Sequence, residues 1–241
     1  GLSEWFYENG QLEYRVNLKD GECHALREVY YENGQLKFKE NYKNGKLDGL
    51  YEYYHENGQL ERRVNFKDGK KHGLEEDFNE NGQLQFRGTY IDGEQNGLTE
   101  TYYENGQLRF RGNLIDGERD GLFEMFHDNG QLDERTNLKD GEQHGLYEEF
   151  YGNGKPKSRM NYKNGLKDGF YENYYENGQL RNRTKYKNNK LDGLWEWFYE
   201  NGQLEYRGNY RDGEPEGPWE FFNEDGNLIG TQTYRNGERV E

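Results

Sequence analysis

The chain has 241 residues, of which 33% are charged and only 30% are hydrophobic, and its formal net charge at pH 7 is −15. So acidic a chain argues against nucleic acid and anionic membranes as partners, because both are bound mainly through Lys and Arg, and it favours a basic protein partner. The aromatic content of 16% argues against disorder, since Tyr and Phe at regular positions supply apolar area that can be buried.

Cysteine usage and apolar runs exclude several classes of protein. The single cysteine, Cys23, excludes a disulfide framework within the chain, and no CxxC or Cys/His cluster is present to hold a structural metal. No apolar run is long enough to span a membrane, and no signal-like segment opens the chain. Because the chain starts at Gly1 without an initiator methionine, we expect that an upstream segment has been removed, so the compartment stays undecided.

A 24-residue repeat recurs ten times without insertion or deletion. The repeats start at residues 1, 25, 49, 73, 97, 121, 145, 169, 193 and 217. We therefore predict one repeat domain over residues 1–241, in which the last repeat also serves as a C-terminal cap. Repetition this strict argues against an active site of scattered residues and favours a binding surface.

Each repeat begins with a predicted strand and continues through an Asn-Gly loop into a second predicted strand. Counted from the first glycine of the repeat, positions 2, 6, 12 and 18 are apolar or aromatic, as in Leu50, Tyr54, Leu60 and Phe66. Alternation with period two, bounded by Asn-Gly and Asp-Gly, is typical of β-hairpins. We predict an all-β fold, an elongated single array of ten hairpin repeats that forms a twisted antiparallel meander, with self-association through edge strands as a possible consequence.

The length of the first loop decides which residues share a face of the sheet. A three-residue loop, such as Glu56-Asn57-Gly58, pairs position 6 with position 12 and places all four apolar columns on one side, so we favour it. The same parity is expected at the second turn, Lys67-Asp68-Gly69. The two-residue alternative would instead set the Glu at position 4 of every repeat opposite the Arg or Lys at position 15 of nine repeats. In the favoured register that Glu needs another partner, such as a Tyr hydroxyl or a backbone N–H.

The favoured register also predicts an outward face rich in aromatic residues. Position 3 would lie opposite the position 15 cations, giving the cation–π pairs Trp195/Arg207, Tyr171/Arg183, Tyr147/Arg159 and Phe123/Arg135. Exposed Trp, Tyr and Arg are the residues that dominate binding hot spots. The predicted protein-binding residues are Tyr171, Trp195, Trp197, Tyr199, Arg207, Trp219 and Phe221. The alternative is that these residues are cross-strand pairs that only stiffen a one-layer sheet.

No residue pattern predicts catalysis, a metal site or a cofactor site. Identical histidine positions, as in His24 and His72 or His55 and His127, lie two or three repeats apart, too far to share a metal. The Asp-Gly-Glu loops hold too few oxygens for calcium, and turn chemistry explains them. No P-loop, GxSxG or GxGxxG motif occurs. The chain is therefore not expected to be an enzyme.

The repeat consensus YENGQLxxRxNYKDGExDGLxExYY closely resembles the bacterial variant of the MORN repeat over the whole chain. Phe86-Arg87-Gly88-Thr89-Tyr90 matches the Tyr-x-Gly-x-Trp run of ordinary MORN repeats with Tyr in place of Trp. The resemblance implies stacked β-hairpins, a role in protein association and no intrinsic catalysis. Many bacterial members are similar to antitoxin or immunity proteins of the YwqK type, and others look like exported or surface scaffolds. The resemblance therefore implies that the protein is located either in the bacterial cytoplasm or at the cell surface.

Overall fold

The computed structural model describes residues 1–240, and within this range it contains strands, turns and short connections. The last residue of the predicted repeat domain, Glu241, lies outside the described residues. The chain divides into two compact units, residues 1–118 and 119–241.

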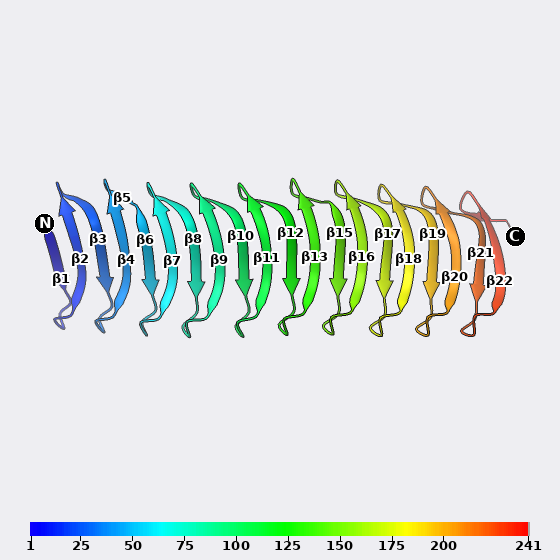
Figure 1. Ribbon diagram of the computed structural model, residues 1–241, viewed down its shortest axis with the longest axis horizontal. Helices are drawn as coiled ribbons and strands as arrows, with labels where there is room; N and C mark the ends of the chain where they lie inside the picture. The colour runs from blue at the N-terminus through cyan, green and yellow to red at the C-terminus, as the bar shows by residue number, and fades with distance from the viewer. Residues whose placement is uncertain (241) are drawn as a thin grey trace. The chain divides into compact units, whose positions relative to one another are not determined.

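Each unit is an antiparallel meander in which successive strands pair, with the Asn-Gly loops along one edge and the Asp-Gly turns along the other (Figure 1). The first unit contains β1 (Leu2–Phe6), β2 (Leu12–Lys19), β3 (Glu22–Tyr30), β4 (Leu36–Lys43), β5 (Lys46–Leu47), β6 (Gly49–Tyr54), β7 (Leu60–Lys67), β8 (Lys70–Phe78), β9 (Leu84–Ile91), β10 (Glu94–Tyr102) and β11 (Leu108–Ile115). The second contains β12 (Glu118–Phe126), which starts at the boundary, β13 (Leu132–Lys139), β14 (Glu142–Gln143), β15 (Gly145–Phe150), β16 (Pro156–Lys163), β17 (Leu166–Tyr174), β18 (Leu180–Lys187), β19 (Lys190–Phe198), β20 (Leu204–Arg211), β21 (Glu214–Phe222), β22 (Leu228–Arg235) and β23 (Glu238–Arg239). The predicted all-β class and the hairpin repeats are confirmed.

The Asn-Gly loop has three residues, as predicted. In the third repeat the backbone N–H of Gly58 donates to the carbonyl of His55 (2.9 Å), and the N–H of His55 donates to the carbonyl of Gln59 (2.9 Å). Gly58 has a φ of 82°, which glycine adopts without the steric cost of a side chain. The side chain of Gln35, from the preceding repeat, lies where a Cβ of Gly58 would stand. The positive φ, which recurs at the same position of the other loops, accounts for the glycine of the repeated Asn-Gly-Gln sequence.

A β-bulge directly after this loop changes the register. Tyr54 pairs with Leu60 as predicted, but the next pair is Tyr53 with Arg62, so Glu61 is an extra residue. Glu52 consequently lies opposite Arg63, the pairing that the two-residue loop would have produced. The prediction that all four apolar columns share one face is therefore wrong, because the bulge reverses the parity of the second strand.

The second turn has two residues, and the prediction of a three-residue turn there is wrong. Lys67 pairs directly with Lys70, and the intervening Asp68 and Gly69 both have positive φ values, 50° and 84°. Two residues in this conformation form a type I′ turn, which matches the twist of the flanking strands. A second irregularity follows, because Val64 pairs with Glu75 whereas Phe66 pairs with Lys71. Because of this irregularity, the first strand of the next repeat begins in the same register as the first strand of the present repeat.

Apolar burial in this one-layer sheet is concentrated on the face that was expected to point outward. The buried hydrophobic residues occupy positions 3 and 16 of their repeats: Val16, Val64, Phe123, Met160 and Trp219. None of the described leucines at position 2 is buried, and some are exposed, with exposed fractions of 49% for Leu98 and 44% for Leu122. Burial of a side chain thus depends on its cross-strand neighbours on the same face of the single sheet.

Side chains in the loops join each repeat to the next. The hydroxyl of Tyr31 donates to the carbonyl of Tyr54 (2.7 Å), and the side-chain amide of Asn33 donates to the carbonyl of Glu56 (3.1 Å). At the opposite edge the N–H of Gly69 donates to the carbonyl of Leu47 (2.8 Å). These bonds satisfy turn backbone groups that the strand ladders leave free.

Candidate functional site

The two faces of the sheet differ in how much their residues vary between repeats. We call the face that carries positions 2, 4, 15 and 17 the invariant face; in the ninth repeat it presents Leu194, Glu196, Arg207 and Asn209. The opposite face carries positions 3, 5, 14 and 16, here Trp195, Trp197, Tyr206 and Gly208, and we call it the variable face. Position 5, for example, is occupied in successive repeats by Trp5, Val29, Tyr53, Asp77, Thr101, Met125, Glu149, Asn173, Trp197 and Phe221. The fold of the repeat therefore does not require one particular type of residue at this position.

Ion pairs saturate the invariant face. Arg63 contacts Glu52 of its own repeat (Nε to Oε1, 3.1 Å) and Glu76 of the next repeat (Nη1 to Oε2, 3.8 Å). Arg135 likewise contacts Glu124 at 3.3 Å and Glu148 at 3.5 Å. Pairs of this kind alternate across the strands of each unit, so the carboxylates are neutralised by the chain itself. The invariant face is consequently explained by structural pairing.

Tyrosines at position 6 complete this ladder. The hydroxyl of Tyr54 donates to Glu52 (3.1 Å), and that of Tyr174 donates to Glu172 (2.7 Å), so the predicted Tyr partner of the position 4 Glu is confirmed in these repeats. Burial alone would raise the pKa of Glu52, but the hydrogen bonds and positive charges around it outweigh burial and hold that pKa below its ordinary value. Glu52 is therefore ionised and paired at neutral pH.

An aromatic cluster occupies the variable face of the last two repeats. It consists of Trp195, Trp197, Tyr206, Tyr210, Trp219, Phe221 and Tyr234, which lie on β19, β20, β21 and β22. Trp197 stacks on Tyr206 with ring centroids 6.0 Å apart, and Tyr206 contacts Phe221 at 6.2 Å. Trp195 lies 5.0 Å from Tyr210, which meets Trp219 edge-on at 5.5 Å. We refer to these seven residues as the aromatic cluster.

Gly208 makes room for the most buried member of the aromatic cluster. Trp219 is only 8% exposed, and a Cβ on Gly208 would overlap its indole ring. The indole N–H of Trp219 is shielded from solvent and has no acceptor among the described residues. The cluster therefore contains a buried donor without a partner beside a broad apolar area.

The structure brings together some of the predicted binding residues and separates others. Trp195, Trp197, Trp219 and Phe221 belong to the aromatic cluster, and Tyr171 lies two strands away on the same face, since Thr184 pairs with both Tyr171 and Trp195. Tyr199 lies in a loop, where its hydroxyl donates to the carbonyl of Phe222 (3.0 Å). Arg207 lies on the invariant face, where its Nε contacts Glu220 at 2.5 Å. The structure therefore separates Tyr199 and Arg207 from the other predicted residues, and protein binding by any of the seven stays a prediction.

The predicted cation–π pairs are also wrong. After the bulge the position 3 aromatics face position 16 in place of position 15: Trp195 faces Gly208, Tyr171 faces Thr184, Tyr147 faces Met160 and Phe123 faces Thr136. Tyr206, Tyr210 and Tyr234 were missed as members of the cluster. Their signal was present as aromatic residues in the second strand of each repeat, but it could be used only once the bulge was known.

A cross-strand row on the variable face continues from the aromatic cluster toward the start of the second unit. Its consecutive pairs run from Glu134 through Glu149, Ser158, Asn173, Asn182, Trp197 and Tyr206 to Phe221. We call these eight residues the mixed row. Burial, followed by the charges of Glu149 and Asp133, raises the pKa of Glu134 above its ordinary value. The row thus combines carboxylates, uncharged polar groups and aromatic rings.

The sequence comparison identifies the repeat. A model of the MORN repeat variant matches this chain ten times, at residues 1–20, 24–44, 47–68, 71–92, 95–116, 119–140, 143–164, 167–188, 191–212 and 215–236. The chain belongs to the MORN repeat variant family. The matches cover both units, so every strand pair described above lies in or between MORN repeats.

Other comparisons add little to the description of this MORN repeat protein. None of the curated proteins compared with the chain matches it. Two solved structures, a TcdB2-TccC3-Cdc42 complex and a Photorhabdus luminescens Tc holotoxin pore, align with 97% of the chain at 13% identity, with TM-scores of 0.23 and 0.24. The chain spans 14% of the length of those chains. TM-scores this low do not establish a shared fold.

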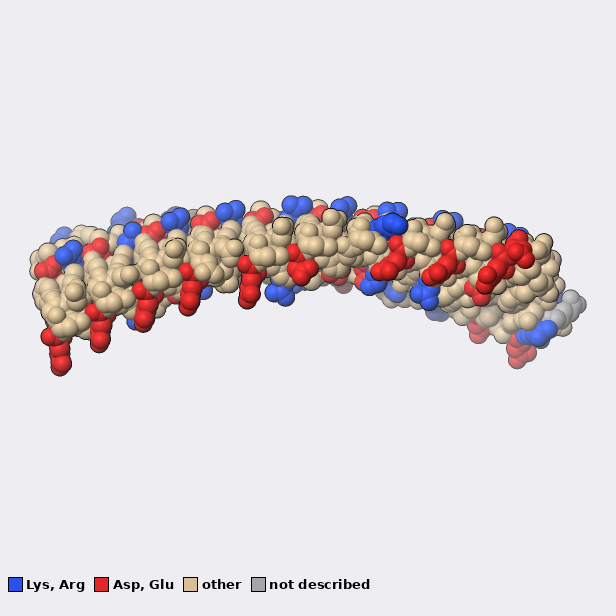
Figure 2. Space-filling view, turned by 90° about the horizontal axis from the view of Figure 1, so that it is seen from below, with Lys and Arg blue, Asp and Glu red and all other residues tan. Residues whose placement is uncertain are grey.

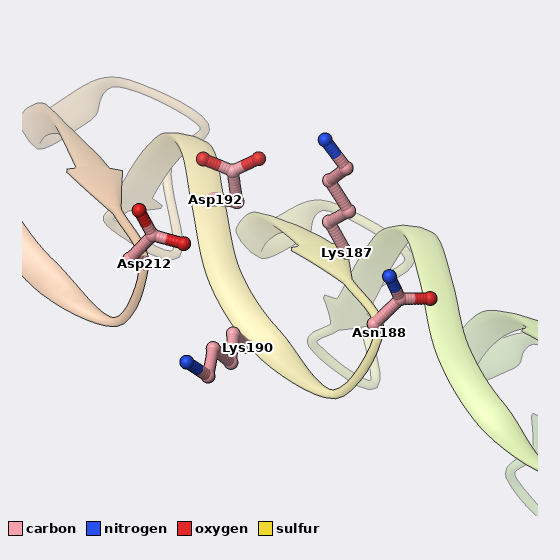
Figure 3. Close-up of a pocket in the computed structure, with 5 residues that line it drawn as sticks. All are labelled: Lys187, Asn188, Lys190, Asp192 and Asp212. Atoms are coloured by element: carbon pink, nitrogen blue, oxygen red, sulfur yellow. The ribbon is translucent and has the colours of Figure 1, made fainter.

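The depressions in the MORN repeat surface are lined mainly by charged and polar residues. One of them, at the Asp-Gly edge of the second unit, is lined by Lys187, Asn188, Lys190, Asp192 and Asp212, whose charges are mixed (Figure 3). Residues 1–240 contain no group of three or more His, Cys, Asp or Glu placed to hold a metal ion. In the same range no helix is long and apolar enough to cross a membrane.

Proposed function

We propose that this MORN repeat protein is a non-catalytic binding module whose variable face, centred on the aromatic cluster, binds a basic protein partner. The observation that carries the proposal is the separation of roles between the faces. The invariant face pairs its Glu and Arg residues with one another, whereas most of the aromatic cluster lies at positions 3, 5 and 14, whose residue types change along the array. Aromatic side chains combine large contact area with little conformational freedom, which suits them to binding interfaces.

The charge of the chain supports a basic partner. The net charge is −15, and acidic residues recur at position 8 in the Asn-Gly loops, all of them exposed: Glu8, Glu32, Glu56, Glu80 and Glu104 in the first unit, and Asp128, Glu176, Glu200 and Glu224 in the second. Figure 2 views the molecule from the side of these loops and shows Asp and Glu side chains recurring along the visible surface. Such a potential accelerates encounter with a cationic surface and weakens as salt rises.

The acidic surface also suits a more specific role, an antitoxin-like or immunity-type protein that covers a basic toxin domain. This role requires one tight partner at 1:1 stoichiometry. A bacterial surface adhesin or scaffold would instead hold several partners through weak sites that act together. Isothermal titration of the captured partner separates the two, because the stoichiometry and the affinity are measured together.

The test of the binding face is a double substitution, Trp195→Ala with Trp197→Ala. We expect it to weaken capture of a basic partner more than about tenfold, as is typical of hot-spot aromatics, while the circular dichroism spectrum stays that of the parent chain. Trp5→Ala is the matched control, because Trp5 occupies the same column in the first unit, stacked on Tyr14 at 4.1 Å. Equal capture by the double variant and the control would show that the cluster only stiffens the sheet.

A further inference from the structure

The mixed row changes its chemistry in order along the second unit. Its first two residues are carboxylates, its next three carry a hydroxyl or an amide, and its last three are aromatic. Neighbouring strands lie about 4.8 Å apart, so the row crosses the sheet in a straight line at that spacing. A ligand that lies across the strands would meet these three kinds of group in the same order.

The carboxylate end lacks a full counter-charge. Glu134 and Glu149 are direct cross-strand neighbours, although like charges in this arrangement are unfavourable. Glu149 accepts a hydrogen bond from Ser158 (2.8 Å), and Lys157 lies at the limit of an ion pair with it, 4.0 Å. The burial and like charge that raise the pKa of Glu134 show that this carboxyl is held in an unfavourable setting. A cation from outside the chain would relieve it.

The first unit shows how the same columns look when the chain supplies its own cation. There Arg62 and Asp77 are the corresponding cross-strand neighbours. Arg62 binds Asp77 through two contacts, Nε to Oδ1 at 2.6 Å and Nη2 to Oδ2 at 3.1 Å. In the sixth repeat Glu134 occupies the column that Arg62 occupies in the third, so this column supplies no guanidinium to Glu149.

The middle and the far end of the mixed row suit the remainder of an extended peptide. Asn173 donates to Asn182 (2.9 Å) and is itself half-buried, so its amide keeps donor and acceptor capacity for a peptide backbone, whereas Asn182 is only 5% exposed. Trp197, Tyr206 and Phe221 then offer a platform of rings. From Glu149 on β15 to Trp197 on β19 is four strand spacings, or about 19 Å.

We propose that the mixed row binds an extended segment of the partner that carries an arginine or lysine about six residues from a large apolar side chain. An extended chain advances about 3.3 Å per residue, so six residues span about 20 Å and match the four strand spacings from Glu149 to Trp197. The cation contacts Glu149, next to Glu134, and the apolar side chain packs on Trp197, next to Tyr206. This inference rests on the proposed function and adds the kind of segment that the variable face selects.

The probe is a fluorescein-labelled seven-residue peptide with arginine at one end, tryptophan at the other and five Ser, Thr or Gly residues between them, titrated with the full chain at low salt by fluorescence anisotropy. Two comparison peptides replace the arginine with citrulline or shorten the spacer to two residues. We expect each change to weaken binding about tenfold or more, because each removes one of the two simultaneous contacts. Equal binding of all three peptides would overturn the inference.

Variants of the protein locate the contact. Glu134→Gln with Glu149→Gln is expected to reduce affinity for the first peptide about tenfold, whereas the control Asp140→Asn with Asp212→Asn, which removes two exposed turn charges of the same unit, changes it less than about twofold. If Trp197→Ala weakens binding but the Glu134/Glu149 variant does not, the inference fails while the proposed function stands. If neither variant weakens binding, both fail.

Discussion

At the scale of single residues, backbone conformation explains most of the invariant glycines and one exception to them. From the second repeat onward, the first residue of the repeat has a positive φ, for example 99° at Gly73 and 92° at Gly145. The second repeat places Ala25 at this position with a φ of 69°, a region that is costly for a residue with a Cβ. Ala25 is therefore a point of local strain within an otherwise regular array.

Replacing Ala25 by glycine should stabilise the protein. We expect Ala25→Gly to raise the free energy of unfolding by about 1 kcal/mol, because the left-handed conformation costs alanine about that much. Equilibrium urea unfolding gives the value. Gly145→Ala is the matched control in the other direction, since a Cβ at Gly145 would meet nothing within 4 Å and only its φ of 92° opposes the change. A loss of stability in Ala25→Gly would contradict the strain.

At the scale of the strand pair, the ion-pair ladder of the invariant face holds neighbouring strands together. Glu52 is 5% exposed and is shared by Lys39 at 2.5 Å, on the preceding strand β4, and Arg63 at 3.1 Å, on the following strand β7. Tyr54 donates a third hydrogen bond to it. A buried carboxylate with three partners on three strands links those strands far more strongly than an exposed surface pair would.

Glu52→Gln should destabilise the first unit by about 2 kcal/mol at pH 7, because two cations lose their charge-assisted bonds. The pKa of Glu52 is lowered in the folded state, so its contribution is present above the ordinary Glu pKa of about 4.3 and is lost as pH falls toward the lowered value. The difference between parent and variant in urea unfolding should therefore shrink below about pH 4. Glu56→Gln, in the exposed loop of the same repeat, should show neither effect. A difference that does not change with pH would refute the ionic account.

At the scale of the whole molecule, contacts are made between neighbouring strands, and the same bonds recur from repeat to repeat. Tyr151 donates to the carbonyl of Tyr174 as Tyr31 does to that of Tyr54, in each case reaching the next repeat. In such an array stability is close to a sum of repeat and interface contributions. The array can therefore change in length by whole repeats.

Deleting residues 145–168, one complete repeat of the second unit, should leave a folded protein. We expect the circular dichroism per residue to stay constant and the free energy of unfolding to fall by about 2 kcal/mol, the share of 24 residues in a typical domain. Deleting only residues 145–156 removes one strand and one three-residue loop, so β16 would follow a two-residue turn and have to run in the opposite direction, which should abolish cooperative unfolding. Equal behaviour of the two deletions would show that the repeat is not the unit of folding.

The sequence by itself determined the repeat, the two strands in each repeat and the three-residue loop, because Asn-Gly and Asp-Gly turns and period-two alternation act locally. The sequence also showed that a Glu column and an Arg column, as in Glu52 and Arg63, could pair with each other. The register predicted from the loop length, however, did not allow this pairing. Only the tertiary structure decided which side chains share a face of the sheet. One bulged residue, Glu61 in the third repeat, changes which residues of the two strands lie on the same face. That reversal moves Trp195 away from Arg207 and next to Tyr210, and it joins Glu134 to Trp197 in one row. The physical reason is that a strand has a period of two, so a single extra residue transfers every following side chain to the other face.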